Sequence, residues 1–297
     1  MKKWTLFLSL YFCLCLLSAC GAAPDTADRD MVQEPLQENA DGGSDTLYSI
    51  TCRVVEVGNG NQLLLADTES GAIYVLPGGA ANLLMDGDDP GGGDLTVDWA
   101  PKAGVLAEVA YDGMILETWP AQFANASAVN IRSDGFDDRC ALYLRVLEDL
   151  WEVDPGLNSD GVTYIGVDLS QTSLSESERA AVTWAFAQKH GGELVQGTYD
   201  ELVEQGYITS QPLEGTDAKF WQWEDGCLFS ITERDEPVAF SLPSIAPGEE
   251  VPAYDAVCFD AQKWRSSLGA YAFSDCTAVR NADGQWGDYT VGSEMVS

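Results

Sequence analysis

The chain has 297 residues, with 48 acidic side chains against 15 basic ones and a formal net charge of −33. A charge of this size repels the phosphates of nucleic acids, so nucleic acid is excluded as a partner. The only histidine is His190, which argues against histidine-based zinc sites and against a triad with a histidine base. The length is enough for two modest domains.

The N-terminus has the pattern of a lipoprotein signal peptide. Lysines at positions 2 and 3 precede an apolar run that is too short to cross a bilayer core but typical of a signal peptide. The sequence LSAC at positions 17–20 resembles the lipobox of bacterial lipoproteins. This resemblance implies cleavage after residue 19, a diacylglycerol on Cys20, and an anchor at the extracytoplasmic face of the cell membrane. An ordinary cleaved signal and an uncleaved anchor are the alternatives.

Residues 20–46 are rich in Asp, Glu, Ala, Gly and Gln and contain few large apolar side chains. Such a segment buries too little apolar surface to offset the entropy that ordering would cost. We therefore expect a disordered acidic tether between the lipid anchor and the folded part of the chain.

Residues 47–132 show short strands separated by turn residues. Alternation over 48–54 predicts a half-buried strand, and its phase slips at Val54-Val55, which indicates a bulge. Further strands are predicted at 62–66 and 72–76. Strands at 105–111 and 114–117 flank Asp112-Gly113 and predict a hairpin. This succession of short strands predicts a small β-barrel or sandwich.

Two stretches of this region resemble a known family. The sequence YDGMILETWPA at 111–121 and the VEVG turn entry at 55–58 are similar to the small OB-like domain of YobA-type lipoproteins of Gram-positive bacteria. The resemblance covers residues 47–132 and implies an OB-like β-barrel without transferable catalytic residues. OB-like barrels often bind oligonucleotides or sugars, and the acidity here argues against oligonucleotides.

The loop at 85–94 contains a cluster of acidic residues, namely Asp86, Asp88, Asp89 and Asp94. An EF-hand loop ends in a bidentate Glu at its twelfth position, which is Val97 when counted from Asp86, so the motif does not match. We predict a solvated loop and keep a looser calcium site on these four residues as the alternative.

Residues 138–297 predict an α+β domain. Apolar residues at helical spacing between Cys140 and Trp151 indicate a helix, and capping boxes at Ser175 and Thr198 predict the starts of two more. A strand is expected at 162–168, and strands at 220–223, 227–231, 256–259, 269–279 and 285–291 follow, with a hairpin at Asp225-Gly226. Helices followed by strands indicate an antiparallel sheet, so the fold class is α+β overall. The run at 259–271 resembles segments of uncharacterised exported proteins.

The cysteines after Cys20 form no Cys-x-x-Cys pair, so neither a zinc knuckle nor a thioredoxin-type motif is predicted. Cys52 and Cys140 lie on apolar faces and are expected to be small buried residues. A disulfide among Cys227, Cys258 and Cys276 is left open, because exported proteins can form such bonds.

The sequence Lys263-Trp264-Arg265 places two cations around an aromatic ring in a chain with few basic residues. One hypothesis is that they bind an anionic or sugar ligand, with Trp264 as a stacking surface. We favour the alternative that the cations pair with carboxylates while Trp264 fills the core. The remaining tryptophans of the strands, Trp119 among them, are likewise expected to pack.

Two further residues are candidates for chemistry. Asp168 ends a predicted strand, where catalytic carboxylates often lie, but one such placement is expected by chance among 48 acidic residues. His190 ends a predicted helix, where a protonated imidazole favours the negative end of the helix dipole, so a structural cap is preferred over a catalytic base.

Together these observations predict a membrane-anchored surface lipoprotein that acts as a non-enzymatic binding or interaction module. Its expected partners are the membrane, through the lipid, and an envelope protein or a wall component. The alternative is a cell-wall-directed hydrolase with carboxylate catalysis, although no sequence spacing identifies the pair of carboxylates it would need. No phosphate-binding or dinucleotide fingerprint is present, and no cofactor is predicted.

Overall fold

The computed structural model describes residues 47–87, 101–159, 161–235 and 255–297. All of them belong to one compact unit, Asp45–Ser297. The predicted signal peptide, Cys20 and the tether lie outside the described residues, as do Asp88, Asp89 and Asp94 of the acidic loop. Within the described part of the chain, no helix is long and apolar enough to span a membrane.

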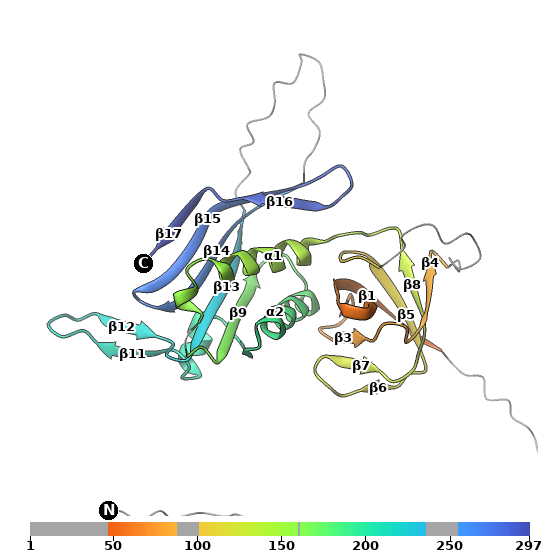
Figure 1. Cartoon of the computed structure of the whole chain (residues 1–297), viewed down its shortest axis with the longest axis horizontal. Helices are drawn as coiled ribbons and strands as arrows, with labels where there is room; N and C mark the ends of the chain where they lie inside the picture. Colours follow the sequence, from red (N-terminus) through yellow and green to blue (C-terminus); the bar gives the residue numbers. More distant parts are fainter. Residues whose placement is uncertain (1–46, 88–100, 160, 236–254) are drawn as a thin grey trace, which may run out of the picture. The chain divides into compact units, whose positions relative to one another are not determined.

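Two mixed β-sheets and few helices make up the described fold, which confirms the α+β class (Figure 1). The α-helices are α1 (Arg139–Glu152), α2 (Glu176–His190) and α3 (Tyr199–Glu204). Short 3-10 turns lie at Asn59–Asn61 and Pro155–Leu157. The predicted helix between Cys140 and Trp151 therefore forms, as α1.

The first sheet has eight strands in the order β4-β8-β5-β1-β2-β3-β7-β6. The pairs β3–β7 and β4–β8 are parallel and the others are antiparallel. No ladder joins the two end strands among the described residues, so the predicted closed barrel is not shown. The strands are β1 (Tyr48–Val57), β2 (Leu63–Asp67), β3 (Ile73–Leu76), β4 (Asn82–Met85), β5 (Leu106–Tyr111), β6 (Ile115–Leu116), β7 (Ala121–Phe123) and β8 (Ala126–Arg132).

The bulge in β1 is confirmed, because the β1–β2 register shifts between Val54 and Glu56. The hairpin predicted around Asp112-Gly113 is wrong: β5 pairs with β1 and β8, whereas β6 pairs with β7. The Asp112 carboxylate accepts hydrogen bonds from the Met114 N–H (3.0 Å) and from Asn125 Nδ2 (2.6 Å). It therefore ties the turn to the residue just before β8, and β8 takes the place beside β5.

The second sheet is mixed, which corrects the predicted antiparallel sheet. β9 pairs in parallel with β10 and with β13, and the remaining pairs are antiparallel. The parallel pair β9–β10 is joined through α2, the crossover that parallel strands require. The strands are β9 (Tyr164–Gln171), β10 (Glu193–Gln196), β11 (Thr209–Pro212), β12 (Lys219–Gln222), β13 (Gly226–Arg234), β14 (Ala256–Ser266), β15 (Gly269–Arg280), β16 (Trp286–Thr290) and β17 (Ser293–Val296).

The hairpin predicted at Asp225-Gly226 is also wrong. β12 pairs with β11 and β14, while β13 pairs with β9 and β14. A Cβ at Gly226 would lie 2.0 Å from Trp223 Cε2. Gly226 is therefore needed for close packing under the buried Trp223 ring and not for a tight turn between paired strands.

Helices α1 and α2 share one apolar core with both sheets. In β2, Leu64 and Ala66 join this core, whereas Leu63 and Leu65 belong to a second core formed by the first sheet. This alternation explains why β2 is apolar from Leu63 to Ala66: both of its faces are buried. A buried hydrogen bond of 2.6 Å from Ser177 Oγ to the Asp67 carbonyl links α2 to the end of β2.

Candidate functional site

Both predicted capping boxes form, and they fix where α2 and α3 begin. Ser175 N–H donates to the Glu178 carboxylate at 2.9 Å, and Thr198 N–H donates to the Glu201 carboxylate at 2.8 Å. Because α2 follows β9 and α3 follows β10, both helix starts lie beyond the carboxyl ends of two parallel strands. In open sheets this edge is a common place for a ligand crevice.

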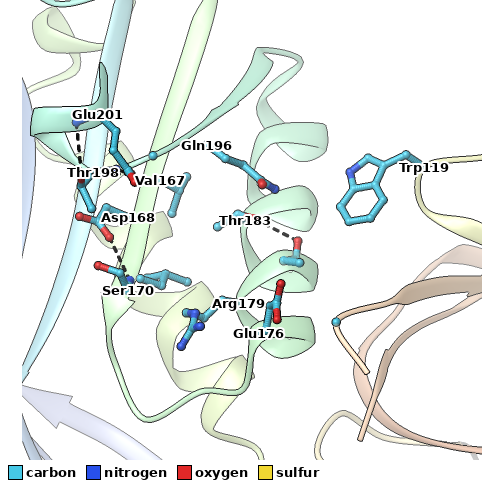
Figure 2. A pocket seen from close by; sticks show the side chains of 14 residues that line it. Trp119, Val167, Asp168, Ser170, Glu176, Arg179, Thr183, Gln196, Thr198 and Glu201 are labelled. Atoms are coloured by element: carbon cyan, nitrogen blue, oxygen red, sulfur yellow. Dashed lines mark hydrogen bonds between the residues drawn. The ribbon is translucent and has the colours of Figure 1, made fainter. Parts of the chain in front are cut away.

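A cavity of about 240 Å³ lies at this edge (Figure 2). β10 ends at Gln196, which pairs with Val167, so Asp168 and Ser170 extend β9 past the end of its neighbour. Helix α2 adds a row of side chains at spacings of three and four, Glu176, Arg179, Ala180 and Thr183. The volume is below the ~300–1,000 Å³ typical of pockets for drug-sized ligands, so the cavity suits one small polar group or ring.

The cavity is acidic. Asp168, Glu176 and Glu201 line it together with a single cation, Arg179. Arg179 donates a hydrogen bond of 2.8 Å to the Leu174 carbonyl, and Asp168 accepts one of 2.9 Å from the Ser170 N–H. Hydrogen bonds from the backbone and the hydroxyl of Thr198 hold the pKa of Glu201 below its usual value. The surplus of carboxylates favours a neutral or cationic ligand over an anion.

Trp119 faces this cavity from the connection between β6 and β7. Its side chain is 57% exposed, which is unusual for so large an aromatic ring. In Figure 2 the indole is turned toward Gln196 and Thr183 on the other side of the cavity. Although packing was predicted for Trp119, the indole presents an open aromatic surface beside carboxamide, hydroxyl and carboxylate groups.

The residues of the Lys263-Trp264-Arg265 candidate site do not converge. Lys263 is fully buried, and its Nζ donates to the Asp154 carbonyl (3.0 Å), to Asn158 Oδ1 (2.6 Å) and to the Val153 carbonyl. Burial lowers the pKa of Lys263.

Trp264 is the next residue of β14, so its side chain points to the opposite face of the strand from Lys263. There it makes an edge-to-face contact with Tyr199, with ring centroids 5.0 Å apart. Arg265 donates to the Glu224 carbonyl at 3.0 Å. The two cations thus contact backbone carbonyls, and the indole packs away from them.

Of the predicted calcium ligands, only Asp86 is among the described residues. Its carboxylate accepts a hydrogen bond of 2.9 Å from the Ser133 N–H, which lowers its pKa. Within the described ranges, no group of three or more His, Cys, Asp or Glu side chains is placed to hold a metal ion.

His190 lies at the end of α2, as predicted, and packs against α1. Its ring stacks on Trp151 with centroids 3.8 Å apart, and its Nε2 lies 3.1 Å from a carboxylate oxygen of Glu148. Burial lowers the pKa of His190 below its usual value. His190 is therefore packed against α1 at the C-terminal end of α2.

The cysteines of the described residues are all free, so no disulfide joins Cys227, Cys258 and Cys276. In the β14–β15 ladder Cys258 pairs with Thr277 and Cys276 pairs with Phe259, which places the two thiols on opposite faces of the sheet. Cys227 lies on β13, and Cys258 on the neighbouring β14 pairs with Arg234, seven residues further along β13. Cys276 lies one strand further away on β15, so neither thiol is within reach of Cys227 for a disulfide.

The fold and this cavity define an α+β protein with an acidic crevice beside an exposed tryptophan. Comparison of the chain with protein-family models, with curated protein sequences and with solved structures finds no match. The resemblance of residues 47–132 to YobA-type lipoproteins therefore stays a prediction.

Proposed function

We propose that the protein is a lipid-anchored binding module of the cell envelope that binds a carbohydrate in the cavity beside Trp119. The observation that carries this proposal is the exposed indole facing a cavity with carboxamide, hydroxyl and carboxylate groups. A sugar ring has an apolar face of C–H groups that stacks on an indole, and hydroxyls on its rim that need donors and acceptors. Gln196, Thr183 and Asp168 supply such groups.

Charge limits the ligand further. The carboxylates around the cavity and the net charge of −33 disfavour anions, including nucleic acids and uronic-acid polymers. The proposed ligand is thus a neutral or amine-bearing glycan, such as a wall component outside the membrane. Attachment through Cys20 would hold the module close to that material.

We further propose that residues 47–132 form an OB-like domain of the type in YobA-type lipoproteins. Strand pairing supports this proposal: β1, β2 and β3 form a meander, β3 pairs in parallel with β7, and β5 pairs with both β8 and β1. Because β8 begins three residues after β7 ends, the path from β1 through β3, β7, β8 and β5 leads back to β1. This order of connections is the one expected if the eight strands derive from an OB-like barrel.

A wall-directed hydrolase has less support. Carboxylate catalysis of glycoside hydrolysis needs a general acid whose pKa is raised. The pKa of Glu201 is instead lowered, because its carboxylate accepts the two hydrogen bonds from Thr198. Shortening of an oligosaccharide by the protein, lost in an Asp168→Asn variant, would favour the hydrolase over the binding module.

The test measures binding of the full chain, purified in detergent, to neutral oligomers of N-acetylglucosamine and glucose and to an oligogalacturonate. We expect binding of a neutral oligomer and none of the anionic one. Trp119→Ala should weaken binding by about 30-fold, the equivalent of ~2 kcal/mol for a central aromatic contact. Met114→Ala, which truncates a side chain that is 58% exposed, is the matched control and should bind normally. No binding of any oligomer, or normal binding by Trp119→Ala, would refute the proposal.

The anchor is tested separately in cells. Wild-type protein should incorporate a labelled fatty acid and sediment with membranes, and Cys20→Ala should abolish the label. A labelled Cys20→Ala protein would disprove attachment at this residue.

A further inference from the structure

A second depression, of about 470 Å³, adjoins the cavity described above. It is lined by Trp119, Trp184, Gln188, Leu194 and Gln196. Trp119 and Gln196 line the first cavity as well. The two hollows therefore meet at these two side chains, and a ligand that fills the first can continue into the second.

The two hollows follow one side of α2. Glu176 and Ala180 line the first, Trp184 and Gln188 line the second, and these residues are spaced by four, which forms a single ridge along a helix. Gln188 lies twelve positions after Glu176, a rise of about 18 Å along the helix axis at 1.5 Å per residue. This length exceeds one sugar ring, whereas the 240 Å³ of the first cavity is filled by a single small group.

The chemistry of the second hollow differs from that of the first. It contains the two indoles and two carboxamides with one aliphatic side chain, and no carboxylate lines it. Carboxamides both donate and accept hydrogen bonds, so they match sugar hydroxyls, while indoles match the C–H faces of sugar rings. A neutral sugar unit fits there, next to a unit held in the acidic cavity.

We propose that the groove along α2 binds an oligosaccharide of at least two rings, with Trp119 at the junction of two subsites. This inference rests on the proposed carbohydrate binding and adds that the ligand is a chain and not a single sugar. Gln188, on the exposed side of α2, belongs only to the second subsite. Replacing Gln188 therefore tests the gain of affinity with chain length without removing a contact in the first subsite.

The experiment measures the affinity of the full chain for β-1,4-N-acetylglucosamine and β-1,4-glucose oligomers of one to six rings by calorimetry. Affinity should rise with length, and Gln188→Ala should lose about tenfold for oligomers of four rings while its affinity for a single ring stays as in the wild type. About tenfold is ~1.4 kcal/mol, the size expected when a side chain that makes one or two hydrogen bonds is removed. Gln211→Ala, at an exposed position of β11 outside both hollows, should bind all lengths normally.

The outcomes separate this inference from the function on which it rests. Binding that is independent of length, or a gain with length that Gln188→Ala leaves intact, would overturn the second subsite while carbohydrate binding stands. No binding of any oligomer would overturn both.

Discussion

Replacing Lys263 with methionine tests whether this lysine holds the end of α1. Its Nζ donates to the carbonyls of Val153 and Asp154 and to Asn158 Oδ1. The Val153 and Asp154 carbonyls directly follow the last residue of α1, where the helix dipole favours a cation. An ammonium group has three N–H donors, and the Trp151 carbonyl lies at 3.5 Å in addition to these acceptors, so each N–H of Lys263 has an acceptor within reach.

The expected cost follows from these contacts. Methionine has nearly the volume of lysine, so no large cavity forms. The Asp154 carbonyl keeps a hydrogen bond of 3.1 Å from the Leu157 N–H, so the main loss is the partner of two polar acceptors, the Val153 carbonyl and Asn158 Oδ1. Each acceptor left unpaired away from water costs about 1–1.5 kcal/mol, which gives about 2–3 kcal/mol together. Burial lowers the pKa of Lys263, so removing the charge also relieves a desolvation cost and offsets part of this loss. We expect a net loss of about 2 kcal/mol.

Thermal and urea unfolding followed by circular dichroism would measure this loss. At roughly 2–4 °C per kcal/mol, Lys263→Met should lower the Tm by about 4–8 °C. Lys219→Met removes an exposed ammonium 5.7 Å from the Trp221 ring centre and should change stability by no more than about 0.5 kcal/mol. If Lys263→Met has the Tm of the wild type, the helix-end role is refuted. Weaker glycan binding by a Lys263→Met protein whose Tm is unchanged would assign Lys263 to a ligand site instead.

Three further predictions concern α2. Ser177→Ala removes the buried hydrogen bond to the Asp67 carbonyl and should lower the free energy of unfolding in urea by about 1–2 kcal/mol. Gly71→Ala places a Cβ 2.9 Å from Glu176 Cδ, so the flexible Glu176 side chain must shift in the cavity. Calorimetry should then show an altered glycan affinity, and the Tm should stay unchanged. Burial lowers the pKa of His190 below 6.5, so the unfolded chain binds the proton more tightly, and stability should rise as pH increases up to about 6.5.

Each of these predictions has a matched control. Ser293→Ala removes an exposed hydroxyl at the start of β17 and should leave stability unchanged. Gly156→Ala adds a Cβ that meets nothing closer than 3.5 Å and should leave glycan affinity unchanged. The rise of stability with pH should be smaller in His190→Gln, and identical pH profiles for the two proteins would contradict the assignment to His190.

Local features of the fold were predictable from the sequence. The capping boxes at Ser175 and Thr198 are satisfied within four residues of chain, and the bulge near Val54 changes the alternation of its own strand. Such features depend on neighbouring residues alone, so a single sequence contains all the information that specifies them.

Strand partners were not predictable in the same way. Asp112-Gly113 and Asp225-Gly226 both have the composition of hairpin turns, yet the flanking strands pair elsewhere. The choice depends on distant segments: β8 pairs with the edge of β5, and β14 lies between β13 and β12. The four-residue strand β10 was missed because Glu193–Gln196 is too short to show a period, and without it the second sheet was expected to be antiparallel.

The candidate site depends on that missed strand. Because β10 stops at Gln196 while β9 continues to Gln171, the edge of β9 is open where α2 and α3 begin. Two capping boxes that each follow a strand were the available signal in the sequence, since helices that follow neighbouring parallel strands start at the same edge of a sheet. Assigning β10 would have placed Asp168 beside Thr198. Trp119 would still have been missed, because its place beside α2 arises from contacts between distant parts of the chain, and a tryptophan in a strand-rich region is expected to be buried until such contacts are known.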